Sequence, residues 1–149
     1  VKGKMIAHQV AQGDVIAYDD SALARYGRGV FLEIVLRANG HTTPAIRVRV
    51  DSAVSFCVFG RQWADILALE WEVGDHVTIR TAMGVFSAYG HDITLHLLDY
   101  EWTAWIVFAE WDTTPPTQAR DVLGLTGFFD HFLVAIDDLS EVIYLEPHV

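Results

Sequence analysis

The chain has 149 residues, of which 52% are hydrophobic and 12% aromatic, so it is long and apolar enough to bury one core and is not disordered. Its 20 acidic and 10 basic residues give a net charge of −10. That balance argues against nucleic acid or anionic membranes as partners, because both require clustered Lys and Arg. No apolar segment is long enough to span a bilayer and no secretion signal is visible, so we expect a soluble protein, with the cytoplasm favoured.

The amino-terminal part of the chain is the hardest to interpret. Residues 1 to 27 have mixed periodicity, with a short helix expected near residues 21 to 26. The pattern becomes regular after this point, and it contains no internal repeat and no low-complexity segment. We therefore expect an N-terminal arm at residues 1 to 27 and one domain at residues 28 to 149.

A hairpin is predicted at the start of this domain. Every second residue from 30 to 36 is apolar, which indicates a strand with one buried face. Asn39 and Gly40 follow, and this pair tolerates the positive φ angles of a tight turn. We expect the strand to fold back onto a second strand at residues 45 to 50.

The middle of the chain predicts one short helix and several strands. Apolar residues recur at helical spacing across residues 61 to 69, just after a glycine. Small residues at 82 to 85 separate two apolar stretches and suggest a projecting hairpin. Residues 93 to 97 alternate as a strand, and residues 102 to 111 are almost continuously apolar, as in a strand covered on both faces. Residues 113 to 118, with two prolines, form the clearest loop.

The last third continues the strand pattern. A short strand at residues 122 to 123 ends at Gly124, and residues 126 to 131 suggest one helical turn. Residues 132 to 136 are predicted to form a buried strand, and residues 142 to 145 a final strand. Many short strands with one or two short helices indicate an all-β protein, either a barrel or a sandwich.

Asp51 is the candidate functional residue with the most suggestive position. It ends the strand at residues 45 to 50 and is followed by the small residues Ser52 and Ala53. A carboxylate on a tight turn between core strands can be partly desolvated, while small neighbours leave room for a ligand. The alternative is that Asp51 only forms the turn, through hydrogen bonds from nearby backbone N–H groups.

Other chemically active side chains suggest no further site. His91 and His96, with Asp92 between them, invite a metal interpretation, but strand residues five apart point to opposite faces and cannot meet one ion. Cys57 is the single cysteine, so no internal disulfide forms, and its apolar surroundings predict a buried, unreactive thiol. We therefore expect no metal, no cofactor and no nucleophilic catalysis.

Two stretches of the chain together resemble the retropepsin-like aspartic peptidases, in particular their bacterial single-domain members. The resemblance extends over roughly residues 28 to 147 and depends on the order and spacing of a few motifs. These are Asp51-Ser52-Ala53-Val54, a short helix near Trp63, a hairpin at Met83-Gly84, Leu123-Gly124, and Gly127-Phe128-Phe129-Asp130.

The resemblance implies a fold and a chemistry. The fold is a small closed β-barrel, and the activity is that of an aspartic endopeptidase whose site is shared by the two subunits of a homodimer. In such a site Asp51 would be the catalytic carboxylate, Ser52 would brace the paired loops, and Ala53 would take the third motif position. The residues implied in substrate binding are a flap formed by Ala82, Met83, Gly84 and Val85, together with Leu123 and Gly124 at the loop.

The sequence departs from the family at three positions. Ala53 stands where a glycine is usual, Ser55 stands where retroviral members have an acidic residue, and Leu125 stands where an arginine often follows the late glycine. The last two changes remove both halves of an ion pair that braces the dimer. An inactive retropepsin-like module used for binding or assembly therefore stays the alternative to a peptidase.

Overall fold

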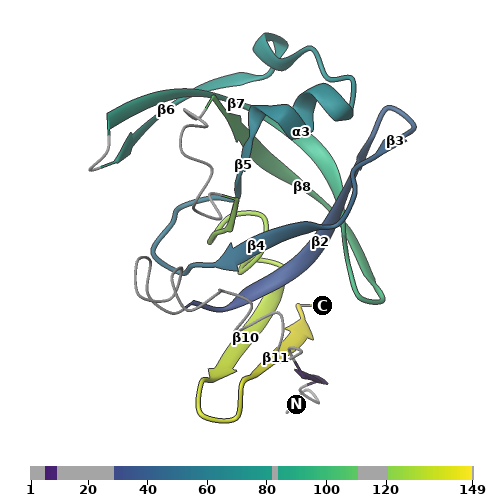
Figure 1. Cartoon of the computed structure of the whole chain (residues 1–149), viewed down its shortest axis with the longest axis vertical. Coiled ribbons are helices and arrows are strands. Elements are labelled where there is room, and N and C mark those ends of the chain that lie inside the picture. The colour runs from purple at the N-terminus through teal and green to yellow at the C-terminus, as the bar shows by residue number, and fades with distance from the viewer. Residues whose placement is uncertain (1–5, 10–28, 82–83, 111–120, 149) are drawn as a thin grey trace, which may run out of the picture.

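The structure is a computed structural model, and it describes residues 6–9, 29–81, 84–110 and 121–148. Six strands, β2, β4, β9, β5, β8 and β7, follow one another around a closed barrel, and a pairing between β7 and β2 completes the circle (Figure 1). The strands of this sheet are β2 (Phe31–Ala38), β3 (His41–Thr42), β4 (Ile46–Val50), β5 (Val58–Gly60), β6 (Asp75–Thr81), β7 (Gly84–Leu97), β8 (Tyr100–Ala109) and β9 (Val122–Leu123). The all-β prediction is confirmed, and of the two predicted architectures, barrel and sandwich, the structure is a barrel.

The hairpin predicted at Asn39 and Gly40 is present. Both residues have a positive φ, 52° and 74°, as a tight turn between antiparallel strands requires. The turn joins β2 to β3, and after a short break the chain continues as β4, which pairs with the first half of β2. Leu32, Ile34 and Leu36 of β2 and the apolar residues of β4 face the core, and the residues between them are half-buried or exposed.

A single 14-residue strand, β7, begins at Gly84 and includes the strand predicted at residues 93 to 97. The strand pairs with β6 along its first half and with β8 along most of its length. Gly90 remains inside the strand because the indole of Trp105 lies directly over it. A Cβ atom at this position would come within 2.1 Å of the Trp105 ring. The glycine therefore serves packing between strands rather than a turn.

Two strand predictions need correction. Continuous burial in β8 is confined to residues 106 to 109, whereas its first half alternates between exposed and buried positions. The strand predicted to be buried at residues 132 to 136 is β10 (Phe132–Asp137), in which Phe132 is buried while Leu133 and Ile136 are 47% and 48% exposed. It lies at the edge of a small sheet rather than inside the core.

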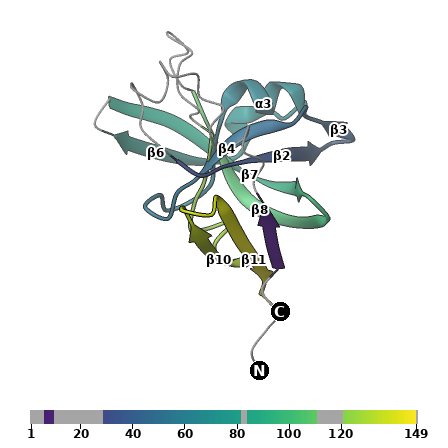
Figure 2. The ribbon, with the colours of Figure 1, turned by 60° about the horizontal axis from the view of Figure 1, so that its bottom comes forward.

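This small sheet contains β1 (Ile6–Gln9), β11 (Val142–Pro147) and β10, in that order, below the barrel in the view of Figure 2. Residues 126 to 131, predicted as a helical turn, form a series of turns that leads into β10. Most of the predicted N-terminal arm and the loop at residues 113 to 118 lie outside the described residues. The division of the chain after residue 27 stays a prediction.

The short helix predicted near Trp63 is α3 (Arg61–Ile66), and a 3-10 turn, η1 (Trp71–Val73), follows it. Buried side chains from β2, β4, β5, β7, β8, β9, β10, β11 and α3 contribute to the main core. A second, smaller cluster of apolar side chains gathers around Val58, Ala88 and Val107, between β5, β7 and β8. This cluster positions the candidate site described next.

Candidate active site

Asp51 follows β4 directly, at the point where the chain leaves the barrel wall. Its N–H group donates a hydrogen bond of 3.0 Å to the carbonyl oxygen of Leu123 on β9, so the parallel pairing of β4 and β9 extends to Asp51 itself. Its own carbonyl oxygen accepts a weak bond of 3.4 Å from the N–H of Val54, which closes a turn over Ser52 and Ala53. The backbone of Asp51 is therefore held from both sides.

The side chain of Asp51 has less support than its backbone. Among the described residues its one hydrogen bond is from the N–H of Ala53, which donates to Oδ1 over 2.9 Å. Asp51 is half-buried, and Ser52 and Ala53 are exposed. Oδ2 therefore makes no hydrogen bond with these parts of the chain. The bond from Ala53 is the one that a turn-forming Asp would make, and it also leaves one carboxylate oxygen available for chemistry.

Ala53, which stands where a glycine is usual, causes no backbone strain. Four residues other than glycine have a positive φ in the described part of the chain, and Ala53 is not one of them. An alanine methyl group is therefore compatible with this backbone. The added methyl group therefore changes only the space available in front of the turn.

Leu123 and Gly124 lie beneath the Asp51 loop. Leu123 is fully buried and Gly124 is buried, so both support the loop from within the barrel. A Cβ atom at Gly124 would come within 2.4 Å of the carbonyl oxygen of Phe56 and within 2.7 Å of that of Val54. Only glycine permits this close approach of the two backbone segments.

Further backbone hydrogen bonds join the loop to the segment after β9. The N–H of Leu125 donates to the carbonyl of Val54 and that of Thr126 to Ser55, both over 2.9 Å. A third hydrogen bond runs in the opposite direction, from the N–H of Cys57 to the carbonyl oxygen of Thr126. The loop and the late Leu-Gly segment thus form one cross-linked unit, as their shared place in the motif predicted.

Cys57 is buried, and its Sγ accepts a hydrogen bond from the N–H of Gly124 over 3.4 Å. Burial raises the pKa of the Cys57 thiol to about 12. The thiol is therefore protonated at physiological pH and is not a nucleophile. The prediction of a buried cysteine is confirmed.

Asp121 supports the same unit, and sequence reasoning missed it. It lies just before β9, where Oδ1 accepts the N–H of Gly60 over 2.8 Å and Oδ2 accepts the indole N–H of Trp63 over 3.1 Å. Desolvation by burial raises the pKa of Asp121, and the two hydrogen bonds act in the opposite direction. An Asp directly before a short apolar strand gave no signal that distinguished it from a loop residue.

The projecting hairpin is formed by β6 and β7. Gly84 begins β7 with a φ of 136°, and Val85 is 60% exposed. Ala82 and Met83, the other predicted flap residues, lie outside the described residues. Partly buried apolar side chains connect the hairpin to the Asp51 loop through the second cluster, and they are Val54, Phe56, Val77, Ile79, Trp105 and Val122. Val77 and Ile79 alternate with polar residues along β6, as in a strand with one apolar face.

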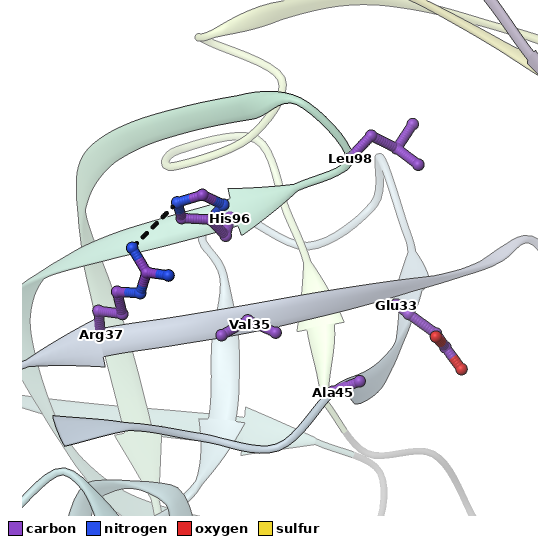
Figure 3. Close-up of a pocket in the computed structure, with 6 residues that line it drawn as sticks. All are labelled: Glu33, Val35, Arg37, Ala45, His96 and Leu98. Carbon is purple, nitrogen blue, oxygen red and sulfur yellow. Dashed lines mark hydrogen bonds between the residues drawn. The ribbon is translucent and has the colours of Figure 1, made fainter.

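A separate hollow of about 310 Å³ lies on the outer face of β2 and β7, away from the predicted site residues. Figure 3 shows Arg37 and His96 at one end of it and Glu33 at the other. Arg37 Nη1 lies 3.3 Å from His96 Nε2, and both side chains also pair with Glu101. Because Arg37 and His96 already pair with each other and with Glu101, these two side chains offer little to a ligand.

The two histidines considered for a metal site are far from sharing one ion. His91 Nε2 donates to the carbonyl oxygen of Trp71 over 2.9 Å, whereas His96 pairs with Glu101 on the outer face. Across residues 6–9, 29–81, 84–110 and 121–148, no three His, Cys, Asp or Glu side chains are grouped as metal ligands would be. No helix in these ranges has the length and apolar character needed to cross a membrane.

The closed six-stranded barrel with one short helix is a retropepsin-like all-β fold. The structure is similar to the crystal structure of a retropepsin-like aspartic protease from Rickettsia conorii, with a TM-score of 0.55 and 18% sequence identity. The match covers 77% of this chain and 89% of that chain. No family model and no curated protein matches the sequence. The fold that the motifs implied is confirmed, and the similarity at this level of identity concerns the fold alone.

Proposed function

We propose that the chain is an aspartic endopeptidase that acts as a homodimer, with one Asp51 from each subunit. The observation that supports this most directly is the position of Asp51. It ends a core strand of a retropepsin-like barrel, its backbone is held by Leu123, and one of its carboxylate oxygens has no hydrogen bond within the described chain. The similarity to a retropepsin-like aspartic protease adds support at the level of the fold.

The proposed chemistry needs two carboxylates. Two acidic groups held close together cannot both ionise easily, so they share one proton. The ionised Asp51 would take a proton from a water molecule that attacks the peptide carbonyl, and the protonated Asp51 would donate to the carbonyl oxygen. One domain of this size supplies one such Asp, so the second must come from another copy.

The surface around Asp51 is suited to contact with a second copy. Ser52 and Ala53 are exposed at the turn, and Leu125, which is bonded to the same loop, is 46% exposed. In the dimer the Ser52 hydroxyl would brace the two loops against each other. The hairpin with Gly84 and Val85 would cover a bound peptide, while Leu123 and Gly124 would hold the loop from beneath.

Replacement of Asp51 by Asn tests the proposal. Two carboxylates that meet at a two-fold axis repel each other and lose hydration, and an amide of the same shape removes that cost. We expect D51N to cleave no peptide at acid pH, where the parent is active, and to be at least as stable as the parent at neutral pH. The measurements are cleavage of a denatured protein mixture, with and without a general aspartic-peptidase inhibitor, and thermal unfolding at one fixed protein concentration.

The hydrogen bond from Ala53 to Asp51 favours a second candidate, an inactive binding or assembly module in which Asp51 only forms the turn. In that case the amide keeps one acceptor but loses the charge that strengthens the bond, so D51N would lose about 1 kcal/mol of stability. A less stable D51N variant that still cleaves whatever the parent cleaves would rule out the shared Asp51 site.

A further inference from the structure

Arg49 lies two residues before Asp51, on the same side of the strand. Along β4 the buried Val48 and Val50 alternate with half-buried arginines. Asp51 continues this alternation, because its N–H still pairs with Leu123 on the neighbouring strand. Residues two apart in a strand project to the same face, with Cα atoms about 6.6 Å apart. The guanidinium of Arg49 therefore belongs to the face that carries the Asp51 carboxylate.

This face is also the one turned toward the projecting hairpin. In the parallel pairing of β4 and β9, Arg49 lies opposite Val122, and side chains of paired residues share a face. Val122 packs in the second apolar cluster with Val54 of the Asp51 loop and Ile79 of β6. Arg49 thus borders the surface that a peptide would occupy between the loop and the hairpin.

The side chain of Arg49 is held in place by packing. Its guanidinium carbon lies 5.4 Å from the centre of the Phe31 ring, in cation–π contact. A Cβ atom at Gly29 would come within 3.3 Å of Arg49 Nε, which shows how closely the backbone covers this nitrogen. Because the stem is fixed, little conformational freedom would be lost when the guanidinium binds a ligand.

The guanidinium of Arg49 has no acidic partner in the described part of the chain. Its Nε is buried there without a hydrogen bond, and none of the ion pairs among the same residues includes Arg49. By contrast, Arg61 pairs with Glu110 at 2.9 Å and Arg37 with Glu101 at 3.6 Å. A ligand that supplies a carboxylate would give this guanidinium the acidic partner that the described residues do not provide.

We propose that Arg49 determines substrate specificity by binding an Asp or Glu side chain of the peptide, next to the bond that is cut. The proposal rests on the proposed peptidase function. A guanidinium binds a carboxylate through two parallel hydrogen bonds, which fixes both the charge and the orientation of the substrate side chain. The apolar residues that share this face, Val54, Ile79 and Val122, provide no other recognition of charge.

Cleavage-site profiling tests the role of Arg49. At about pH 5.5, where a Glu side chain of ordinary pKa about 4.3 is ionised, the parent should prefer an acidic residue at one position flanking the cut. R49L should reduce cleavage of acidic substrates by roughly ten- to a hundredfold, the range of one charged hydrogen-bonded contact, and favour apolar residues instead. R49E should prefer Lys or Arg. The matched control is R47L, on the same strand face but farther from Asp51, which should keep the acidic preference.

A binding measurement separates failure of this proposal from failure of the peptidase proposal. The D51N variant is titrated with two pools of short fluorescent peptides of mixed sequence that differ only in Glu or Leu at one central position. We expect D51N to bind the Glu pool at least about tenfold more tightly, and the D51N/R49L double variant to lose this difference. If the parent cleaves nothing but this difference is found, the peptidase proposal fails and acidic recognition by Arg49 stands.

Three results would overturn the role of Arg49. The first is cleavage by the parent without an acidic preference, and the second is equal binding, or no binding, of the two pools by D51N. The third is an unchanged preference in R49L together with a weaker dimer in sedimentation, which would assign Arg49 to an acidic residue of the second copy.

Discussion

Asp51 and Asp121 lie on neighbouring segments of the barrel, yet they are held in opposite ways. Both oxygens of Asp121 accept hydrogen bonds, from the N–H of Gly60 and the indole of Trp63. One oxygen of Asp51 accepts a hydrogen bond, from the N–H of Ala53 two residues away. The side chain of Asp121 ties the start of β9 to the junction of β5 and α3, whereas that of Asp51 is bonded within its own turn.

This difference in hydrogen bonding indicates which carboxylate supports the structure and which is available for chemistry. A carboxylate whose lone pairs are occupied by buried donors stabilises those donors, and its removal leaves them without partners. A carboxylate fixed through its backbone, with an oxygen still open, can bind and transfer a proton. The predictions below are ordered by the expected size of the effect on stability.

Removal of Asp121 should have the largest effect. D121A leaves the buried N–H of Gly60 and the half-buried indole N–H of Trp63 without an acceptor, so we expect a loss of about 3 kcal/mol in the free energy of unfolding. Urea unfolding measures this quantity. D51A is the matched control, and it should cost no more than about 1 kcal/mol. Equal losses for the two variants would contradict the distinction between the two carboxylates.

Replacement of Gly124 tests the close packing between the Asp51 loop and the segment that follows β9. A methyl group in G124A would meet the carbonyl oxygens of Phe56 and Val54, neither of which is a flexible side-chain end, so the loop must shift. We expect a loss of about 2 kcal/mol. G40A is the control: Gly40 has a φ of 74° but no atom within 4 Å, so the cost is limited to backbone strain of about 1 kcal/mol. Thermal unfolding compares them, and a smaller loss in G124A than in G40A would contradict the close approach.

The raised pKa of Asp121 predicts a dependence of stability on pH. Since the pKa is higher in the folded than in the unfolded chain, the folded state binds more protons between the two values. The contribution of Asp121 is therefore fully present below the unfolded pKa of about 3.9 and is lost as the pH rises through the folded value. The stability of the parent relative to D121N should fall over this window. A rise, or a constant difference, would contradict the direction of the shift.

The smallest effect on the folded subunit is expected for Ser52. Its side chain is exposed, so S52A should change the unfolding free energy by less than about 0.5 kcal/mol at a dilution where subunits are separate. If the Ser52 hydroxyl braces two loops, the same variant should weaken dimerisation. Sedimentation across a concentration range measures the dimer, and an unchanged dissociation constant would remove Ser52 from the proposed contact.

Much of the fold could be predicted because its signals are local. The Asn39-Gly40 pair specifies its own turn, and the alternation in β2 and β4 follows from burial of one face. The position of Asp51 at the end of a strand needed only that pattern. Its identity as a candidate catalytic residue needed the later Leu123-Gly124 motif, since an Asp that closes a strand is common by itself.

The rest depends on contacts between residues that are distant in sequence. Gly90 fits inside β7 under the indole of Trp105, and nothing local in the sequence shows this contact. Asp121 and Arg49 drew no attention because the acceptor role of one and the missing partner of the other become visible only in three dimensions. Strand β10 was predicted to be buried from its apolar residues, but it forms the edge of a sheet whose outer positions are exposed.

The pairing that closes the barrel has a consequence for how the chain acquires its structure. Strands β6, β7 and β8 are successive in the chain and pair as a meander, so they can assemble rapidly and early. Closure requires β2 to reach β7, where Arg37 and His96, 59 residues apart, come into contact. Bringing together segments so far apart in sequence costs conformational entropy of the intervening chain before any contact compensates for it. The Asp51 loop also depends on a distant contact, from the N–H of Asp51 to Leu123, so we expect it to reach its final form after the β6–β7 hairpin.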